Sequence, residues 1–387
     1  MLKRHNASVE LLPHDVVELI LERLPVDSLL RFKSVSKKWK STTDSGRFQQ
    51  GQFLRRRQSR GPDVLCLPLS DDEDTDATRF AFGSSKASTV WFPVSRKLFC
   101  YGSCDGLLCL CSLYEQSASV VVNPATRWHR SFPLSNVQHL IIEKYNKSEV
   151  AYPLPRLGFG KDKVTGTYKP VYLYNSFEFK LDNVTTCEVF DFRTNAWRYV
   201  VPSSPHRILG HYEPVYLDGS LYYLTKEETE VLPFSFPAET SFEVKLLSLD
   251  LHTETFQVIC KAPFVQPHSS DLYSITMCIL DDRLCVSEKN WPNQDIWSFD
   301  GANKTWTVMC SIDLTESVSL FEERSFARSS IAQPSIAFVD KNKLLLRGND
   351  YFHTLFIYDL HTKSFDLLFK PTKPVGPVYY FESLFHV

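Results

Sequence analysis

One short polar phrase recurs five times between residues 120 and 387, and it constrains the fold more than any other feature of the chain. In each copy an Asp or Asn ends an apolar run, a Thr or Asn follows a few residues later, and an aromatic residue opens the next run. Because Asp, Asn and Thr side chains can bond the backbone groups of a turn, each copy predicts a strand, a turn and a second strand. The copies are VVVNPATRW (120–128), VFDFRTNAW (189–197), SLDLHTETF (248–256), SFDGANKTW (298–306) and IYDLHTKSF (357–365).

A second pair of apolar runs lies upstream of these copies and often has its own acidic turn. Two hairpins per repeat make four strands, and the aligned Thr or Asn positions are 68, 59, 50 and 59 residues apart. Four-stranded units at a period of about 50 residues are typical of the blades of a β-propeller. The upstream pairs are CDGLLCL (104–110), LDGSLYYL (217–224), LDDRLCV (280–286) and VDKNKLLL (339–346).

The two ends of this region carry the strands of one further blade. VLCLPL (64–69), TRFAFG (78–83) and VWFPV (90–94) come first, and VYYFESLFHV (378–387) comes last. Pairing the C-terminal strand with the N-terminal ones would close a ring of six blades, with about 54 residues in each. We expect closure because an open ring would leave a bare sheet edge that invites aggregation.

The first part of the chain, residues 11–56, has helical periodicity. Pro13 suits a first helical position, Asp15 lies in the first turn, and Pro25 ends the run. Between them, apolar residues recur at helical spacing and form one wide stripe: Val16, Val17, Ile20, Leu21 and Leu24.

Further short helices are expected around Leu29 and Leu30 and from about Ser36, where Val35 and Trp39 are four residues apart. Three or four helices of two or three turns are marginal alone. Their apolar side chains therefore need a partner or an attached domain.

The combined order of these residues resembles an F-box. The resemblance is carried by Leu12-Pro13-x-Asp15, Ile20-Leu21-x-Arg23-Leu24-Pro25, Leu29-Leu30-Arg31-Phe32 and Val35-Ser36-Lys37-x-Trp39. It implies docking on a Skp-type adaptor, which joins the cullin of an SCF ubiquitin ligase, although several of these residues must also form the module's own core. By position, the implied adaptor-facing residues are Leu12, Pro13, Val17, Ile20, Leu24, Pro25, Leu29, Leu30, Val35 and Trp39.

Most of residues 95–387 resembles the F-box-associated domain of plant F-box proteins. The motifs that carry this are SCDGLL (103–108), NPATRW (123–128), GFGKDKVTGTY (158–168) and VFDFRTNAWR (189–198). Such proteins are often labelled kelch-like, but this chain lacks the Gly-Gly pair of kelch repeats, and it has Pro170 where the family more often has a DYKV ending.

The expected fold is therefore α+β and multidomain, a small N-terminal helical F-box followed by an all-β propeller of six blades, as counted above. We expect a disordered lead over residues 1–10, the F-box over 11–56, a linker over 57–62, and a propeller over 63–387 closed by the C-terminal strand.

Composition narrows the class of function. A net charge of −2 gives no electrostatic case for nucleic acid or an anionic membrane, and no apolar run reaches the ~20 residues of a membrane span. No secretory leader is recognised, and ten scattered cysteines suit reduced thiols in the cytoplasm or nucleus. The basic run Arg55–Arg60 could be a nuclear address, but we favour a solvated helix end.

One motif suggests catalysis, and its context argues against it. Gly102-Ser103-Cys104-Asp105-Gly106 has the form of a nucleophile elbow, which requires a strand, a sharp turn and a helix. Here a strand follows, and Asp-Gly is a hairpin-turn signal. The cysteines at 100, 104, 109 and 111 match no zinc spacing, and the acidic run 71–76 lacks the spacing of a calcium loop. No catalytic, metal or cofactor site is expected.

The sequence thus favours a non-catalytic substrate receptor of an SCF ligase, which binds the adaptor through its helices and an unidentified target through its propeller. A scaffold or inhibitor acting outside the ligase is the alternative, and a propeller hydrolase is a weaker one. The target-binding residues are unknown, although loops of a propeller carry recognition. Six insertions are expected to line one face: Gln138–Tyr152, Tyr174–Thr186, Ser203–Tyr212, Lys226–Phe242, Lys289–Asp295 and Thr315–Gln333.

Overall fold

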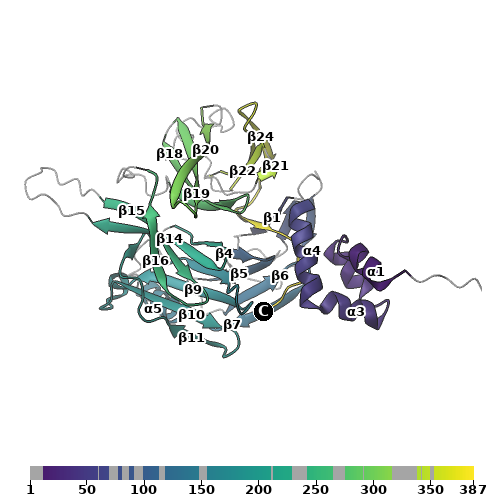
Figure 1. The fold of residues 1–387 in the computed structure, drawn as a ribbon. Coiled ribbons are helices and arrows are strands. Elements are labelled where there is room, and N and C mark those ends of the chain that lie inside the picture. Colours follow the sequence, from purple (N-terminus) through teal and green to yellow (C-terminus); the bar gives the residue numbers. More distant parts are fainter. Residues whose placement is uncertain are drawn as a thin grey trace, which may run out of the picture.

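The computed structural model places four helices beside a ring of β-sheets (Figure 1). The part of the chain that it describes comprises residues 12–59, 61–68, 77–80, 87–90, 99–112, 118–147, 155–210, 212–228, 242–264, 275–290, 292–315, 338–340, 342–348 and 353–387. The acidic run 71–76 lies outside these ranges.

The helical module follows the pattern expected from its sequence. Its helices are α1 (His14–Leu21), α2 (Val26–Phe32), α3 (Lys37–Asp44) and α4 (Gly46–Ser59). Ser36 caps α3, because its hydroxyl accepts a hydrogen bond from the backbone N–H of Trp39 at 3.1 Å. Helix α1 ends three residues earlier than the apolar stripe, at Leu21, because a residue before proline avoids the helical conformation and Pro25 already caps α2.

Helix α4 is longer than the sequence suggested. It spans 14 residues to Ser59 and so includes part of the expected linker, residues 57–62. The first strand starts at Asp63, only four residues after the helix ends. The helical module therefore joins the propeller through a continuous helix and a very short connection.

Six four-stranded antiparallel blades form the ring, as the repeats predicted, and in blade 4 a short extra strand, β13 (Val215–Leu217), also pairs with β14. From the inner to the outer strand the blades are β25 (Val375–Tyr380), β1 (Asp63–Pro68), β2 (Ala77–Phe80), β3 (Ala87–Val90); β4 (Phe99–Cys104), β5 (Leu107–Cys111), β6 (Ser119–Asn123), β7 (Trp128–Phe132); β8 (Leu157–Lys161), β9 (Tyr168–Asn175), β10 (Thr185–Asp191), β11 (Ala196–Tyr199); β12 (Arg207–Ile208), β14 (Ser220–Glu228), β15 (Phe242–Asp250), β16 (Phe256–Lys261); β17 (Ile275–Leu280), β18 (Arg283–Asn290), β19 (Asn293–Asp300), β20 (Thr305–Asp313); and β21 (Phe338–Asp340), β22 (Lys343–Arg347), β23 (Leu355–Asp359), β24 (Ser364–Phe369).

The ring closes by pairing the two ends of the propeller. Strand β25 pairs with β1 over six residues, from Asp63 opposite Tyr380 to Pro68 opposite Val375. The expected C-terminal strand, 378–387, is thus shifted: it starts at Val375 and stops at Tyr380, and the last seven residues leave the sheet. Those seven residues have a separate role, described below.

Apolar clusters fill every gap between neighbouring blades. Leu65 packs with Leu108 between blades 1 and 2, and Val64 packs with Leu345 between blades 6 and 1, where the ring closes. Four further clusters fill the remaining gaps between successive blades. Because burial of apolar surface stabilises by about 25 cal/mol per Å², these contacts hold the blades in a closed ring.

The propeller has two faces, and the path of the chain decides what lies on each. Within a blade the first and second strands are joined on one face, as are the third and fourth, and we call this the near face. The second-to-third connections and the crossings between blades lie on the opposite, far face. In blade 1 the near-face ends of the first two strands are Tyr380, where β25 ends, and Asp63, where β1 begins. The helical module precedes Asp63 in the chain, so it attaches to the near face.

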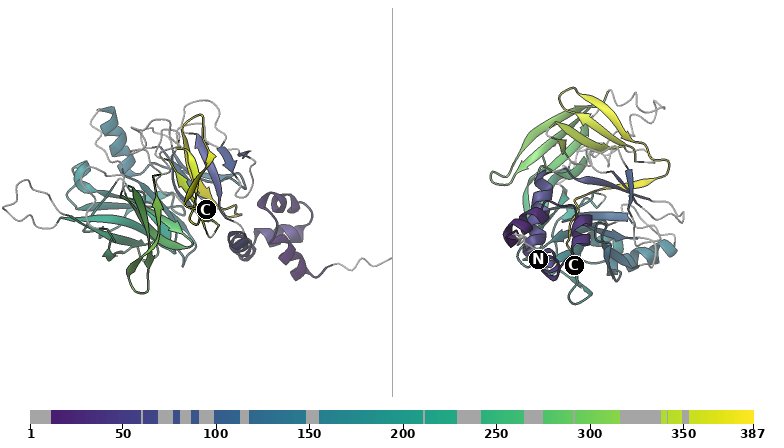
Figure 2. Two further views of the ribbon diagram at one scale, coloured as in Figure 1. Left: turned by 90° about the horizontal axis from the view of Figure 1, so that it is seen from above. Right: turned by 90° about the vertical axis from the view of Figure 1, so that its right-hand side faces the viewer.

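All six predicted insertions connect strand ends of the far face. One contains helix α5 (Asn136–Asn146), which lies across the propeller from the helical module (Figure 2), and another contains a short 3-10 helix, η1 (Ser176–Phe179). The prediction of a long insertion at Lys289–Asp295 was wrong. Strand β18 continues to Asn290 and β19 starts at Asn293, so these strands are joined by a tight hairpin. Most of Lys226–Phe242 and Thr315–Gln333 lies outside the described residues.

The recurring polar phrase forms the turns of the near face, as predicted. In each copy the Asp or Asn carboxyl or amide oxygen accepts hydrogen bonds from backbone N–H groups two or three residues on; Asp250 accepts from His252 and Thr253, each at 2.8 Å. One or two residues before the next strand, a residue then adopts a left-handed conformation, as at Lys363 with φ 56°. The equivalent acceptors are Asn123, Asp191, Asp250, Asp300 and Asp359.

Candidate adaptor-docking surface and its seam with the propeller

Helix α1 has one face fixed to the rest of the module. Leu21 is fully buried in the helical core. The Glu18 carboxylate lies 2.6 Å from the guanidinium of Arg47, and Glu22 lies 3.3 Å from Arg55, both on α4. These contacts fix the rotation of α1 about its axis, and therefore decide which side chains point outward.

The outward face of α1 is apolar and open. The exposed fractions are 60% for Leu12, 40% for Val16, 47% for Leu19 and 46% for Ile20, and we call these four residues the apolar strip. Val35, in the turn before α3, is also 60% exposed. A contiguous apolar surface on a small module is typical of a protein interface.

The ten residues that the F-box resemblance implied divide into three groups. Leu12, Pro13, Ile20, Pro25 and Val35 are exposed. Val17, Leu24, Leu30 and Trp39 are half-buried against the helical core, and the Trp39 ring meets that of Phe32 edge-on at 5.6 Å between centroids. Leu29 is completely buried in that core, so it supports the surface from within.

Val16 and Leu19 belong to the open surface, although neither was among the ten. The apolar stripe in the sequence gave Val16 no distinct role, because spacing alone does not say which half of a wide stripe faces inward. The ion pairs of Glu18 and Glu22 with α4 provide that information, and they were not foreseen.

A buried charge cluster connects α4 to the propeller. Arg56 of α4 lies 3.7 Å from both Asp63 and Glu382, and Arg79 of β2 lies 2.5 Å from Glu382. The side chains of Asp63 and Glu382 are at most 5% exposed. Burial lowers the pKa of Arg79, but the carboxylates of Glu382 and Asp63 raise it by more, so the Arg79 guanidinium stays charged.

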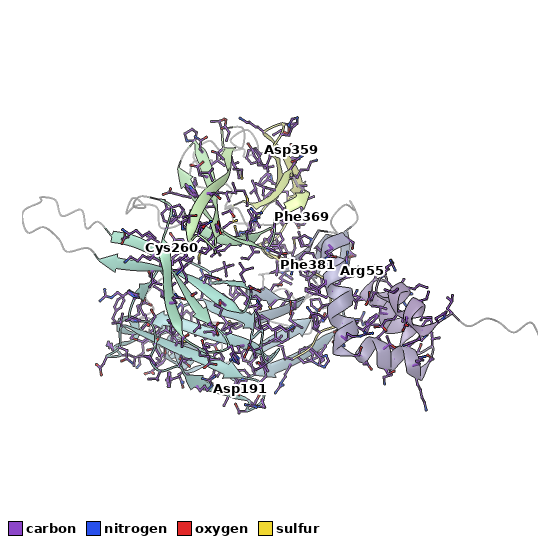
Figure 3. The ribbon with its side chains drawn as sticks, in the orientation of Figure 1. Arg55, Asp191, Cys260, Asp359, Phe369 and Phe381 are labelled. Atoms are coloured by element: carbon purple, nitrogen blue, oxygen red, sulfur yellow. The ribbon has the colours of Figure 1, made fainter. Side chains whose placement is uncertain are left out.

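This cluster corrects the interpretation of the basic run Arg55–Arg60 as a solvated helix end. Only 13% of the Arg56 side chain is exposed, and Arg57 pairs with Asp282 in the β17–β18 turn of blade 5. Arg56 and Arg57 therefore contact carboxylates of blades 1 and 5 and of the C-terminal residues. Arg55, labelled on α4 in Figure 3, pairs instead with Glu22 of α1. Arg60 lies outside the described residues.

The cysteine-containing segment at 102–106 is a hairpin, not an elbow. Strands β4 and β5 flank a two-residue turn in which Asp105 and Gly106 both have positive φ, 52° and 78°. Burial raises the pKa of the Cys104 thiol well above its ordinary value. A protonated, buried thiol between two strands is a poor nucleophile.

Two further properties of the described part of the chain concern membrane spans and metal sites. None of its helices has the length and hydropathy needed to cross a membrane. Within the same residues, His, Cys, Asp and Glu side chains do not gather in threes at metal-binding geometry.

Comparison with known proteins agrees with this architecture. A family profile described as F-box domain matches residues 9–50, and one described as F-box associated beta propeller domain matches residues 87–387. F-box protein At1g11270 of Arabidopsis thaliana is 57% identical over 307 residues, which cover 78% of this chain and 93% of that protein. F-box/LRR-repeat/kelch-repeat protein At1g09650, also from Arabidopsis thaliana, is 46% identical over 402 residues, covering 100% and 99% respectively.

A helical module with an open apolar strip, joined through a charged seam to a closed six-bladed ring, defines a β-propeller protein with an N-terminal helical module. The chain belongs to the family of F-box proteins that carry an F-box-associated β-propeller domain.

Proposed function

We propose that this protein is a substrate receptor of an SCF-type cullin–RING ubiquitin ligase, with the F-box bound to a Skp-type adaptor and the propeller bound to a target protein. The observation that supports the proposal most directly is that the apolar strip and Val35 are exposed to solvent, although the helices also pack against the propeller part of the chain. In such a receptor the chain supplies no reactive group. It raises the effective concentration of the target near the charged ubiquitin.

The far face of the propeller is the side on which we propose that the target binds. Helix α4 and the C-terminal residues already occupy turns of the near face, through Asp63, Gly106 and Asp282. The far face carries the insertions, and exposed aromatic side chains occur there at Tyr145 and Phe177. A target held on that face would lie away from the adaptor and not compete with it.

Adaptor binding tests the proposal directly. We expect Ile20→Asp and Val35→Asp each to weaken binding of the full chain to a purified Skp-type adaptor at least tenfold, because each places a charge in an apolar contact, and tenfold corresponds to about 1.4 kcal/mol. These positions are exposed, so the substitutions leave the helical core intact. Calorimetry or surface binding gives the dissociation constants.

A matched control is Val308→Asp, which changes an equally exposed valine on the outer strand of blade 5. Its dissociation constant should stay within twofold of wild type. Normal adaptor binding by the Ile20→Asp, Val35→Asp double variant would rule out this surface.

The Ile20→Asp variant also distinguishes a ligase receptor from a scaffold or inhibitor acting outside the ligase. Proximity labelling with and without a proteasome inhibitor identifies candidate targets. For a ligase receptor, Ile20→Asp should still label those targets and should lengthen their half-lives. Unchanged half-lives would favour the scaffold.

A further inference from the structure

The last seven residues, Phe381–Val387, leave the inner strand of blade 1 and pass between α4 and the ring; we call them the C-terminal tail. Figure 3 shows Phe381 at this seam, close to α4. Residues 382–385 are buried, and Ser383 is completely so. The tail therefore contacts both the F-box helices and the propeller.

On one side, the tail completes the core of the F-box. Leu384 packs in the same cluster as Leu21, Leu29 and Phe48, which come from α1, α2 and α4. The Phe53 ring of α4 meets the ring of Phe385 edge-on at 5.4 Å, and that of Phe381 at 6.3 Å. Without the tail, the helices would expose the apolar surface that Leu384 covers.

On the other side, the tail is bound by blade 2. The Asn123 side-chain amide donates hydrogen bonds to the carbonyl oxygens of Ser383 at 3.0 Å and Phe385 at 2.8 Å. Gly106 lies so close that a Cβ there would be 2.2 Å from the Phe381 carbonyl oxygen. The tail reaches this position only as the continuation of β25, the strand that closes the ring.

We propose that the C-terminal tail is a conformational device that makes the adaptor-binding arrangement of the F-box depend on closure of the propeller. The adaptor part of this inference rests on the proposed function. A chain that is truncated, or whose ring has not closed, presents helices that lack Leu384 and the Glu382 contact with Arg56. Only a complete receptor then joins the ligase.

Two glycine substitutions test this coupling without touching a helix. Gly106→Ala places a methyl group against the tail backbone in the Asp105-Gly106 turn. Gly219→Ala is the matched control, because the Asp218-Gly219 turn of blade 4 has the same sequence and a similar φ, 88° against 78°, but the atoms nearest to its Cβ would belong to the flexible side chain of Lys163. Both carry the same backbone strain, and only the first reaches the tail.

Hydrogen exchange of the free full-length protein is the primary measurement, and adaptor affinity is the second. In Gly106→Ala we expect amides of α2 and α4 to exchange at least tenfold faster, and the adaptor dissociation constant to rise at least tenfold. Gly219→Ala should stay within twofold of wild type in both. If the amides of α2 and α4 exchanged at the same rate in the two glycine variants, the proposal would be overturned.

Leu384→Ala changes the tail itself and tests the same coupling if Gly106→Ala unfolds the ring. The β18–β19 amides of blade 5 report unfolding of the ring, because these two strands pair with each other inside a blade and are not part of the helical module. Leu384→Ala should speed exchange in α2 and leave β18–β19 unchanged; protected α2 amides would refute the coupling. If the wild-type chain binds no adaptor, the proposed function fails, and the exchange results still decide the role of the tail.

Discussion

At the scale of single residues, Glu382 connects the helical module to the propeller through buried ion pairs. It is 4% exposed and lies within ion-pair distance of Arg56 and Arg79, which come from α4 and from blade 1. Removing the Glu382 charge leaves two buried guanidinium groups to share the one carboxylate of Asp63, which costs more than the loss of a surface pair. This residue therefore links the two parts of the molecule energetically.

We expect Glu382→Gln to lower the free energy of unfolding by about 3 kcal/mol or more, the usual cost of breaking a buried pair from one side. Denaturant unfolding followed by circular dichroism measures this. Glu143→Gln is the control, because Glu143 of α5 and Lys147, which follows the helix, form an exposed pair, and exposed pairs contribute little to stability. Similar losses in the two variants would contradict the role assigned to the cluster.

At the scale of elements, the near-face turns explain why the sequence was informative. The Asp or Asn of each phrase supplies its own turn with acceptors, so the pattern acts locally and can be recognised without the rest of the fold. The GFGKDKVTGTY motif is a sixth example: Asp162 accepts from the backbone N–H groups of Val164 at 2.8 Å and Thr165 at 3.2 Å. Ser36 at the start of α3 was predictable for the same reason.

The elements that were not predicted depend on distant partners. The end of α4 and the true end of β25 are set by contacts among Arg56, Asp63 and Glu382, which are far apart in the chain. The division of the α1 stripe into Leu21 inside and Ile20 outside likewise depends on α4. Periodicity locates an element but does not reveal the surface against which it packs.

The Asp162 turn makes stability depend on pH. Burial raises the pKa of Asp162, but hydrogen bonds from Thr165 and His252 lower it by more, to about 2. Since that value is below the ~3.9 of an unfolded aspartate, the unfolded chain binds more protons, and this stabilisation is lost as the pH falls from about 4 to about 2. We expect the melting temperature of wild type to fall over this range.

Asp162→Asn keeps the acceptor oxygen of the turn and removes the titration, so its melting temperature should fall less between pH 5 and pH 2.5 than that of wild type. Asp182→Asn, at an exposed position in the far-face loop after η1, controls for the loss of one carboxylate. Parallel pH curves for wild type and Asp162→Asn would show that this turn does not contribute.

At the scale of the whole molecule, the F-box and the propeller form one unit. The helical core includes Leu384 of the C-terminal tail, and blade 1 combines strands from both ends of the propeller. The six-bladed architecture followed from the repeat, because closure by the two ends is the way to remove a free edge. The fixed orientation of the helices did not, since it depends on a seam between segments more than 300 residues apart in sequence.

A fixed seam has a mechanical consequence for a ligase receptor. The surface that we propose for the adaptor lies on the module attached to the near face, and the insertions that we propose for the target lie on the far face. On this proposal, the distance between adaptor and target is set by the fold rather than by a flexible linker. Such positioning is what effective concentration depends on.

The most direct test of this account is hydrogen exchange of the full chain with and without a Skp-type adaptor. We expect new protection at α1, over the apolar strip, and in the turn that holds Val35, and no change in α5 or η1 on the far face. Protection of α5 and η1 with none at α1 would contradict the proposed separation of adaptor docking from target binding.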